Sequence, residues 1–231
     1  MAIPILLIPG LNATAEVFAS QVPALWQFGP VTIADHRHGE TLAEIAANIL
    51  AKAPPTFALV GFSMGGYIAF EILRQAPERV TKLALLDTSA RPDSEESTTS
   101  RRRLIALAQK GRFLEALDQT FPRSVHPGHA DDSNLYAIHR AMSEANGPEV
   151  FEQQQEAIIA RPDSRSLLAS ISLPTLIIVG EGDQITPPEV AREMHEGIAG
   201  STLLLVPHAG HMALLEQPEP VHAALREWAA A

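Results

Sequence analysis

The sequence predicts an α/β fold, in which a mostly parallel sheet of about six strands carries helices on both faces and a small helical lid insertion. Three observations predict it. Short apolar runs bounded by Gly, Pro or Asp alternate with segments of helical periodicity. The chain has 231 residues, of which 46% are hydrophobic, enough to form one substantial core. One long stretch breaks the alternation and contains helical patterns alone.

Each predicted strand is an apolar run with the length of a strand buried on both faces. These runs cover residues 3–8, 31–34, 56–61, 83–87, 175–180 and 202–206. Helical periodicity between and after them covers residues 14–28, 41–52, 64–75, 188–198 and 218–228. Because parallel strands must be joined by crossovers of roughly a dozen residues, strands that alternate with helices predict a parallel sheet covered on both faces.

Residues 90–171 contain no good strand pattern, and their apolar residues recur at helical spacing. Gly111, Gly147 and Pro162 divide the stretch into separate helices. An insertion between two strands would lie over the carboxyl ends of the sheet, where open α/β sheets bind ligands. We expect residues 1–89 and 172–231 to form the core and residues 90–171 to form a lid; the alternative is that these helices extend the core.

Composition narrows the classes of function. The formal net charge of −10 argues against a surface for nucleic acid or an anionic membrane, since either needs clustered positive charge. The absence of cysteine excludes disulfides and a thiolate nucleophile. The apolar N-terminal run lacks a basic segment and is too short for a signal peptide or a membrane span. We expect a cytoplasmic protein that acts on a small molecule.

The motif with chemical meaning is Gly61-Phe62-Ser63-Met64-Gly65-Gly66, placed where a predicted strand ends and a helix begins. A nucleophilic serine on such a sharp turn requires small residues two positions before and two after it, because the chain packs closely there. Ser63 is therefore the predicted nucleophile, with Gly61 and Gly65 as the elbow glycines. The alternative is a glycine-rich turn in which Ser63 caps the helix.

A serine nucleophile needs a base and an orienting acid, and on this kind of sheet they follow in the order Ser, Asp, His. Asp183 comes after the fifth predicted strand, and His211 comes after the sixth. Their order and placement predict Asp183 as the acid and His211 as the general base. Three nearby residues are alternatives: Glu181 and Asp87 for the acid, and His208 for the base.

Attack on a carbonyl also needs two N–H donors for the developing oxyanion. One is expected from Met64, the residue after the nucleophile, and the other from the loop after the first strand, Pro9-Gly10-Leu11-Asn12. Gly10 allows a close backbone approach, so Leu11 N–H is the predicted donor, with the Asn12 side-chain amide next. The alternative is that Pro9-Gly10 forms an ordinary turn.

Two histidine groups have a spacing that could suggest a metal site: His126 with His129, and His36 with His38. Neither has an acidic or third histidine partner at helical spacing. We expect solvated loop histidines, no metal and no cofactor.

Together these motifs resemble the α/β-hydrolase superfamily, in its serine esterase, lactonase and C–C hydrolase branch. The similarity covers nearly the whole chain except residues 90–171. It rests on the 61–66 elbow, Ala76-Pro77-Glu78-Arg79-Val80, Gly180-x-x-Asp183-x-x-x-Pro187 and Gly210-His211. The chain departs from the family pattern at Pro9-Gly10, where the family usually has His-Gly, a histidine that often braces the loop. It also begins at what corresponds to the third strand of the family, so a shortened sheet is expected.

The resemblance implies a cofactor-independent serine hydrolase. We expect a carboxylesterase that acts on small apolar esters through an acyl-enzyme on Ser63, because the insertion offers apolar walls and no evident polar anchor. The alternatives are a lactonase or C–C bond hydrolase with the same residues, or a non-catalytic receptor for a small ligand.

Overall fold

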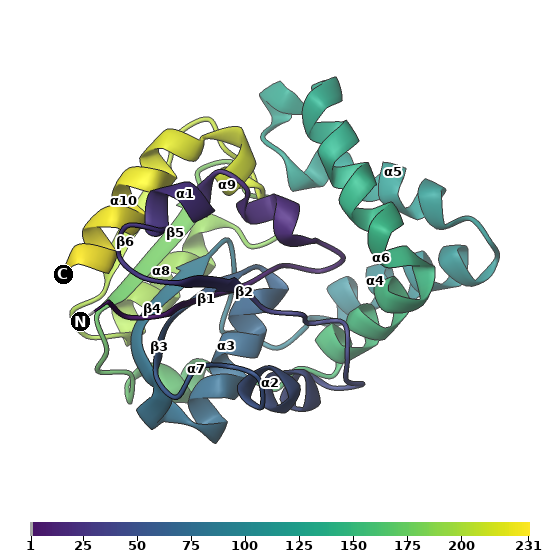
Figure 1. Ribbon diagram of the computed structural model, residues 1–231. Helices are drawn as coiled ribbons and strands as arrows, with labels where there is room; N and C mark the ends of the chain where they lie inside the picture. Colours follow the sequence, from purple (N-terminus) through teal and green to yellow (C-terminus); the bar gives the residue numbers. More distant parts are fainter. Residues whose placement is uncertain (1) are drawn as a thin grey trace.

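A parallel sheet lies at the centre of the molecule (Figure 1), whose structure is a computed structural model describing residues 2–231. Its six strands follow the order β2-β1-β3-β4-β5-β6, and each neighbouring pair is parallel. The predicted fold class is confirmed. The strands are β1 (Ile5–Ile8), β2 (Val31–Ile33), β3 (Phe57–Phe62), β4 (Val80–Leu86), β5 (Thr175–Gly180) and β6 (Thr202–Val206).

Helices cover both faces of the sheet, and successive strand residues contact opposite layers. Leu6 and Ile8 of β1 belong to the apolar cluster under one set of helices, whereas Ile5 and Leu7 belong to the cluster under the other. The first set is α2 (Leu42–Leu50), α3 (Met64–Gln75) and α8 (Pro188–Gly197). The second is α1 (Gln21–Leu25), α9 (Ala213–Glu216) and α10 (Pro218–Ala230).

The prediction of one continuous helix over residues 14–28 is wrong. The segment forms a short 3-10 helix, η1 (Ala15–Phe18), and then the separate helix α1. Pro23 gives the reason: it has no N–H to donate to the Ala19 carbonyl, so a helix cannot run through this point without losing a hydrogen bond. Thr14 caps η1, with its Oγ1 accepting the Glu16 N–H at 3.3 Å.

The remaining predicted elements are found close to their expected bounds. The largest difference is at β4, which begins at Val80 rather than at residue 83. A single 3-10 turn, η2 (Pro77–Arg79), separates it from α3.

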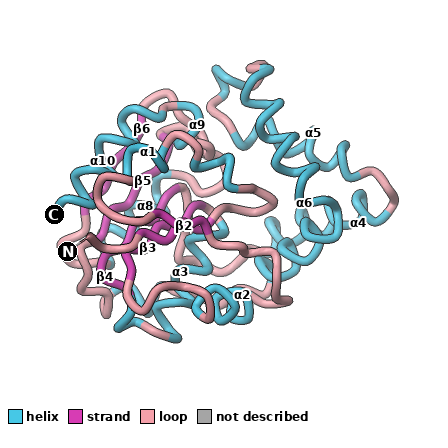
Figure 2. Tube along the Cα trace, in the orientation of Figure 1, coloured by secondary structure: helices cyan, strands magenta, loops and turns pink. Residues whose placement is uncertain are grey.

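Most residues between β4 and β5 form a lobe of helices and loops that stands beside the core, as Figure 2 shows. Gly111 (φ 73°) joins the first two helices, and Gly147 (φ 80°) kinks the longest one, as only glycine readily adopts these angles. The elements of the lobe are α4 (Glu95–Gln109), α5 (Phe113–Ser124), η3 (Pro127–His129) and α6 (Ser133–Ile159), whereas α7 (Arg165–Leu168) packs beside α8 on the core.

The end of α6 joins this lobe to the core. Ala157 and Ile158 are buried in the same cluster as α3 and β3. On its other side α6 is tied to α4, where Arg101 Nη1 donates to Gln155 Oε1 at 2.7 Å. Within residues 2–231, no helix combines the length and apolar character needed to cross a bilayer.

The strand order reverses direction at β1, which has β2 on one side and β3 on the other. In open α/β sheets the connections from two neighbouring strands run to opposite faces at such a switch point, which leaves a crevice for a ligand at the carboxyl ends of the strands. The loop after β1 and the turn after β3 both lie at this edge of the sheet. The predicted oxyanion loop and Ser63 lie there.

Candidate active site

Ser63 lies on a strained turn between β3 and α3. Its φ of 51° and ψ of −115° are unusual for a residue with a side chain, and such conformations cost on the order of 1–3 kcal/mol. Two hydrogen bonds with residues at and just after the end of β4 hold the turn. Ser63 N–H donates to Leu86 O, and Thr88 Oγ1 donates to Ser63 O, both at 2.8 Å. The neighbouring strand therefore stabilises the backbone that carries the hydroxyl.

The two predicted elbow glycines lie where a side chain would not fit. A Cβ on Gly61 would be 2.5 Å from Gly65 O, and one on Gly65 would be 2.1 Å from Ile8 O. The first turn of α3 thus packs directly against the end of β1. This contact brings the loop after β1 to the nucleophile.

The structure brings Ser63, His211 and Asp183 into one hydrogen-bonded relay. Ser63 Oγ lies 2.8 Å from His211 Nε2, and His211 Nδ1 lies 2.8 Å from Asp183 Oδ2. Asp183 follows β5 and His211 follows β6, and parallel strands end at the same edge of a sheet. None of the three residues is more than 9% exposed, so water competes little with these contacts.

The charge on Asp183 sets the tautomer of His211. Burial raises the pKa of Asp183, but the His211 charge and hydrogen bonds from His211 and Thr186 outweigh burial and hold the pKa below its ordinary value. An ionised carboxylate only accepts hydrogen bonds, so Nδ1 of His211 carries the proton. Nε2 is then an acceptor for the Ser63 hydroxyl, the arrangement that general-base activation of serine requires.

The three alternative residues lie elsewhere. Glu181 and His208 are exposed. Asp87 is fully buried, and its Oδ1 accepts the Gly180 N–H at 2.9 Å. Burial, together with the negative charge of Asp183, raises the pKa of Asp87 well above its ordinary value and favours its neutral form. A carboxyl that is bound to the β5 backbone and not to His211 is a structural group.

Glu216 is a site-supporting residue that no sequence pattern singled out. Its side chain is fully buried, and its Oε1 accepts the Gly210 N–H at 2.8 Å, next to His211. Its Oε2 accepts the His126 N–H at 2.7 Å and contacts His129 Nδ1 at 2.8 Å. The expectation of solvated histidines is therefore wrong for His126 and His129, which are partly buried. A single Glu closing a helix looks like an ordinary surface residue in sequence.

The loop after β1 presents two N–H groups without an acceptor among residues 2–231, those of Gly10 and Leu11. Asn12 N–H donates to Gln154 Oε1 at 2.7 Å, and Ala13 N–H donates to Gly10 O at 3.2 Å. Leu11 N–H has no acceptor among residues 2–231. Met64 is the first residue of α3, and the N–H of a first helical residue has no acceptor within its helix. These are the two predicted oxyanion donors.

His36 braces this loop, in contrast to its expected place in solvent. It is 2% exposed, and its Nε2 lies 2.8 Å from Gly10 O. Burial lowers the pKa of His36 to about 4, so the ring is neutral at pH 7 and donates its Nε2 proton to that carbonyl. His36 thus provides a brace at the loop where Pro9 replaces the usual histidine. His38, by comparison, is exposed as expected.

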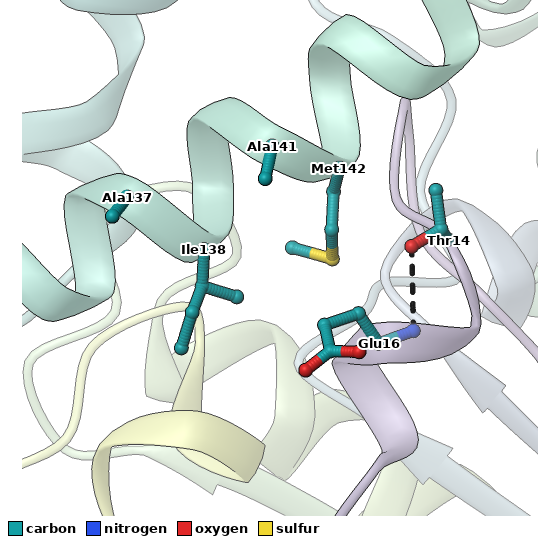
Figure 3. A pocket seen from close by; sticks show the side chains of 6 residues that line it. All are labelled: Thr14, Glu16, Ala137, Ile138, Ala141 and Met142. Carbon is teal, nitrogen blue, oxygen red and sulfur yellow. Dashed lines mark hydrogen bonds between the residues drawn. The ribbon is translucent and has the colours of Figure 1, made fainter.

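An open groove of about 400 Å³ runs between η1 and the first half of α6 (Figure 3). Its walls are mainly apolar, and the relay residues do not line it. Met142, at its base, belongs to the same buried cluster as Phe62, the residue before Ser63. The lining residues are Thr14, Glu16, Ala137, Ile138, Ala141 and Met142.

Comparison with known proteins gives a family match over most of the chain. The family described as alpha/beta hydrolase fold matches residues 28–218. Pimeloyl-[acyl-carrier protein] methyl ester esterase from Neisseria meningitidis serogroup B (strain MC58) is 25% identical over 96% of this chain and 91% of its own length. The protein of the same name from Vibrio campbellii is 24% identical over 98% of this chain and 94% of its own length.

Solved structures with the same fold include two hydrolases. A thermophilic esterase from Thermogutta terrifontis superposes with a TM-score of 0.87 at 30% identity, covering 98% of this chain and 89% of its own. The enol-lactonase from Burkholderia xenovorans LB400 gives a TM-score of 0.88 at 24% identity, covering 100% of this chain and 92% of its own. The second similarity shows the fold alone.

The buried Asp87 carboxyl generates a prediction about stability and pH. In the unfolded chain this group ionises near its ordinary value of 3.8, whereas the folded protein retains the proton to higher pH. The wild type therefore loses stability as pH rises from that value through the folded pKa. Asp87→Asn keeps an oxygen for Gly180 N–H and cannot ionise. We therefore expect the thermal unfolding midpoint of Asp87→Asn minus that of wild type to increase as the pH rises from 4 to 8.

Asp183→Asn is the matched control, because the folded pKa of Asp183 is lowered. Its carboxylate contributes stability that is present above the unfolded pKa and lost as pH falls through the folded pKa. The thermal midpoint of this variant relative to wild type should therefore change little above about pH 5, and should rise as pH falls below 3.8. A constant difference between Asp87→Asn and wild type across the pH range would contradict the assignment of a neutral Asp87.

Proposed function

This chain belongs to the alpha/beta hydrolase fold family, and on that premise we propose that it is a carboxylesterase that cleaves small, uncharged esters through an acyl-enzyme on Ser63. The chain is a serine ester hydrolase, and to this we add the residues that carry out the reaction and the kind of ester. The observation that carries the assignment is the buried relay from Ser63 Oγ through His211 to Asp183, with 2.8 Å at each step.

In the first half of the reaction, Ser63 Oγ attacks the ester carbonyl carbon while its proton moves to His211 Nε2. The carbonyl electron pair moves to oxygen, where the N–H groups of Leu11 and Met64 stabilise the negative charge. Asp183 stabilises the imidazolium that has formed. The tetrahedral intermediate then collapses, the alkoxide leaves with the proton from His211, and the acyl group remains on Ser63.

The second half repeats these steps with water. His211 Nε2 removes a proton from water as its oxygen attacks the acyl carbon, and the same two N–H groups hold the oxyanion. Collapse breaks the bond to Ser63 Oγ, which recovers its proton from His211. The acid is released and the enzyme returns to its starting state. No bond change in this sequence requires a cofactor.

The groove between η1 and α6 supports an uncharged, mainly apolar substrate. Four of its six lining residues are alanine, isoleucine or methionine, and Glu16 is its one charged residue. The negative charge of Glu16, within a chain of net charge −10, disfavours an anionic acyl group in this groove. The first half of α6 forms one wall of this groove, and we assign helices α4 to α6 as the lid of the site.

The first test combines labelling with a substrate panel. A fluorophosphonate probe should label wild-type protein at Ser63 and leave Ser63→Ala unlabelled, because only an activated serine attacks it at a useful rate. Nitrophenyl esters with short acyl chains should be hydrolysed faster than long-chain or anionic ones, and faster than lactones. Absence of both labelling and ester hydrolysis in folded protein would indicate a non-catalytic receptor; faster turnover of lactones would change the substrate class.

A second prediction concerns the acid. Asp183→Asn should lower kcat by roughly a thousandfold or more, because the amide no longer holds the productive tautomer of His211. Asp87→Asn should lower kcat less than about tenfold, since Asp87 contacts backbone rather than His211. Steady-state kinetics on a nitrophenyl ester, with circular dichroism to confirm folding, measures both. The reverse order of effects would assign the acid to Asp87.

A third prediction concerns the second oxyanion donor, which is a main-chain group. Leu11→Ala keeps the N–H and should leave kcat within about tenfold, whereas Leu11→Pro removes the N–H and should lower kcat on the order of a hundredfold or more. Each variant must first show a thermal unfolding midpoint near that of Ser63→Ala, the reference variant that lacks the nucleophile and keeps the fold. If Leu11→Pro melts normally and turns over at close to the wild-type rate, the donor lies elsewhere, with the Asn12 amide as the next candidate.

A further inference from the structure

The second half of α6 is joined by hydrogen bonds to the two loops that follow β1 and β2. Asn146 Nδ2 donates to Ala13 O at 3.0 Å. Gln153 Nε2 donates to Gly39 O. Gln154 binds both loops, because its Oε1 accepts Asn12 N–H at 2.7 Å and its Nε2 donates to His36 O at 3.3 Å. A helix of the insertion is therefore a direct partner of the loop that carries Leu11.

Gln154 is fully buried, at 0% exposure, and both ends of its amide are paired. A buried amide that lost its partners would leave unsatisfied polar groups in the loop as well as in the side chain. These two bonds therefore hold Asn12 and His36 in a fixed relation to each other. His36 in turn holds Gly10 O through its Nε2 at 2.8 Å.

The direction of the Leu11 N–H follows from this brace. The carbonyl of Gly10 and the N–H of Leu11 belong to one trans peptide unit, in which the two bonds point in opposite directions. By holding Gly10 O, His36 turns the Leu11 N–H to the opposite side. By holding Asn12 N–H, Gln154 fixes the next peptide unit, so Leu11 is held on both sides. The loop itself lies against the nucleophile: a Cβ on Gly10 would be 3.1 Å from Ser63 Cβ.

We propose that His36 and Gln154 are positioning residues that together orient the Leu11 N–H for the oxyanion. This rests on the proposed function, in which Leu11 is a donor. It assigns to α6 a part in the chemistry beyond covering the site. The brace acts where negative charge develops in the transition state, so its loss should lower kcat while leaving substrate binding nearly unchanged.

The first pair of variants is Gln154→Met and Gln153→Met, neighbours on the same helix with the same change in shape. Gln154→Met should lower kcat at least about tenfold with KM within about threefold, whereas Gln153→Met, which does not touch residues 10–12, should leave kcat within about twofold. Turnover is counted per serine labelled by fluorophosphonate, so unfolded protein does not contribute. Equal kcat values for the two variants would overturn the proposal.

The second pair tests the other half of the brace by rescue. His36→Gln keeps a donor that can reach Gly10 O and should retain kcat within about threefold, while His36→Leu removes the donor and should lower kcat at least about tenfold. This pair decides the question if Gln154→Met fails to fold. Equal kcat values for His36→Gln and His36→Leu would show that the ring serves packing alone.

A trifluoromethyl ketone gives a readout that a purely structural role would not change. Ser63 Oγ adds to its carbonyl carbon, the proton moves to His211 Nε2, and the ketone oxygen becomes an oxyanion held by the same donors. Its affinity should fall in Gln154→Met and His36→Leu by about the same factor as kcat. Unchanged affinity would overturn the proposal. If the wild type itself is neither labelled nor active, the proposed function fails instead, so the two failures are distinct.

Discussion

The backbone of Ser63 is the constraint on which the rest of this structure depends. A residue with φ of 51° and ψ of −115° is stable only when its surroundings allow no alternative. Here Leu86 O, at the end of the neighbouring strand β4, accepts from the Ser63 N–H, and Thr88 Oγ1, just after that strand, donates to Ser63 O. Because the turn changes direction within one residue, α3 begins directly over the end of β3 and the hydroxyl projects from the edge of the sheet toward His211.

Close packing around this turn decides where the other groups must lie. Gly65 allows α3 to lie against Ile8 O, so the loop after β1 continues past the nucleophile. The parallel order of β4, β5 and β6 brings the turns after these strands to the same edge, which is how Asp183 and His211 reach Ser63. Glu216 holds the His211 loop from behind through Gly210 N–H. The relay is therefore a product of strand order and of backbone contacts as much as of three side chains.

Two parts of the insertion between β4 and β5 are attached to the core in different ways. Its first helices, α4 and α5, form the lobe together with the first half of α6, and this half of α6 also forms one wall of the groove. After the kink at Gly147, α6 enters the core and binds the loops after β1 and β2. The kink thus separates the lobe from a part of α6 whose position is tied to the oxyanion loop.

The pattern of neighbouring residues in the sequence was sufficient to predict the fold class and the order of the nucleophile, the acid and the base along the chain. Alternating apolar runs and helical segments determine a parallel α/β sheet, and G-x-S-x-G at a strand-to-helix boundary determines the elbow, because both depend on neighbours within a few residues. Only the tertiary structure decided which carboxylate serves His211. Asp87 and Asp183 both end strands, but one is buried against Gly180 N–H and the other faces the imidazole. Likewise, the contact between Gln154 and Asn12 joins residues 142 positions apart, and no periodicity or spacing in a sequence records which distant backbone groups a buried side chain will meet.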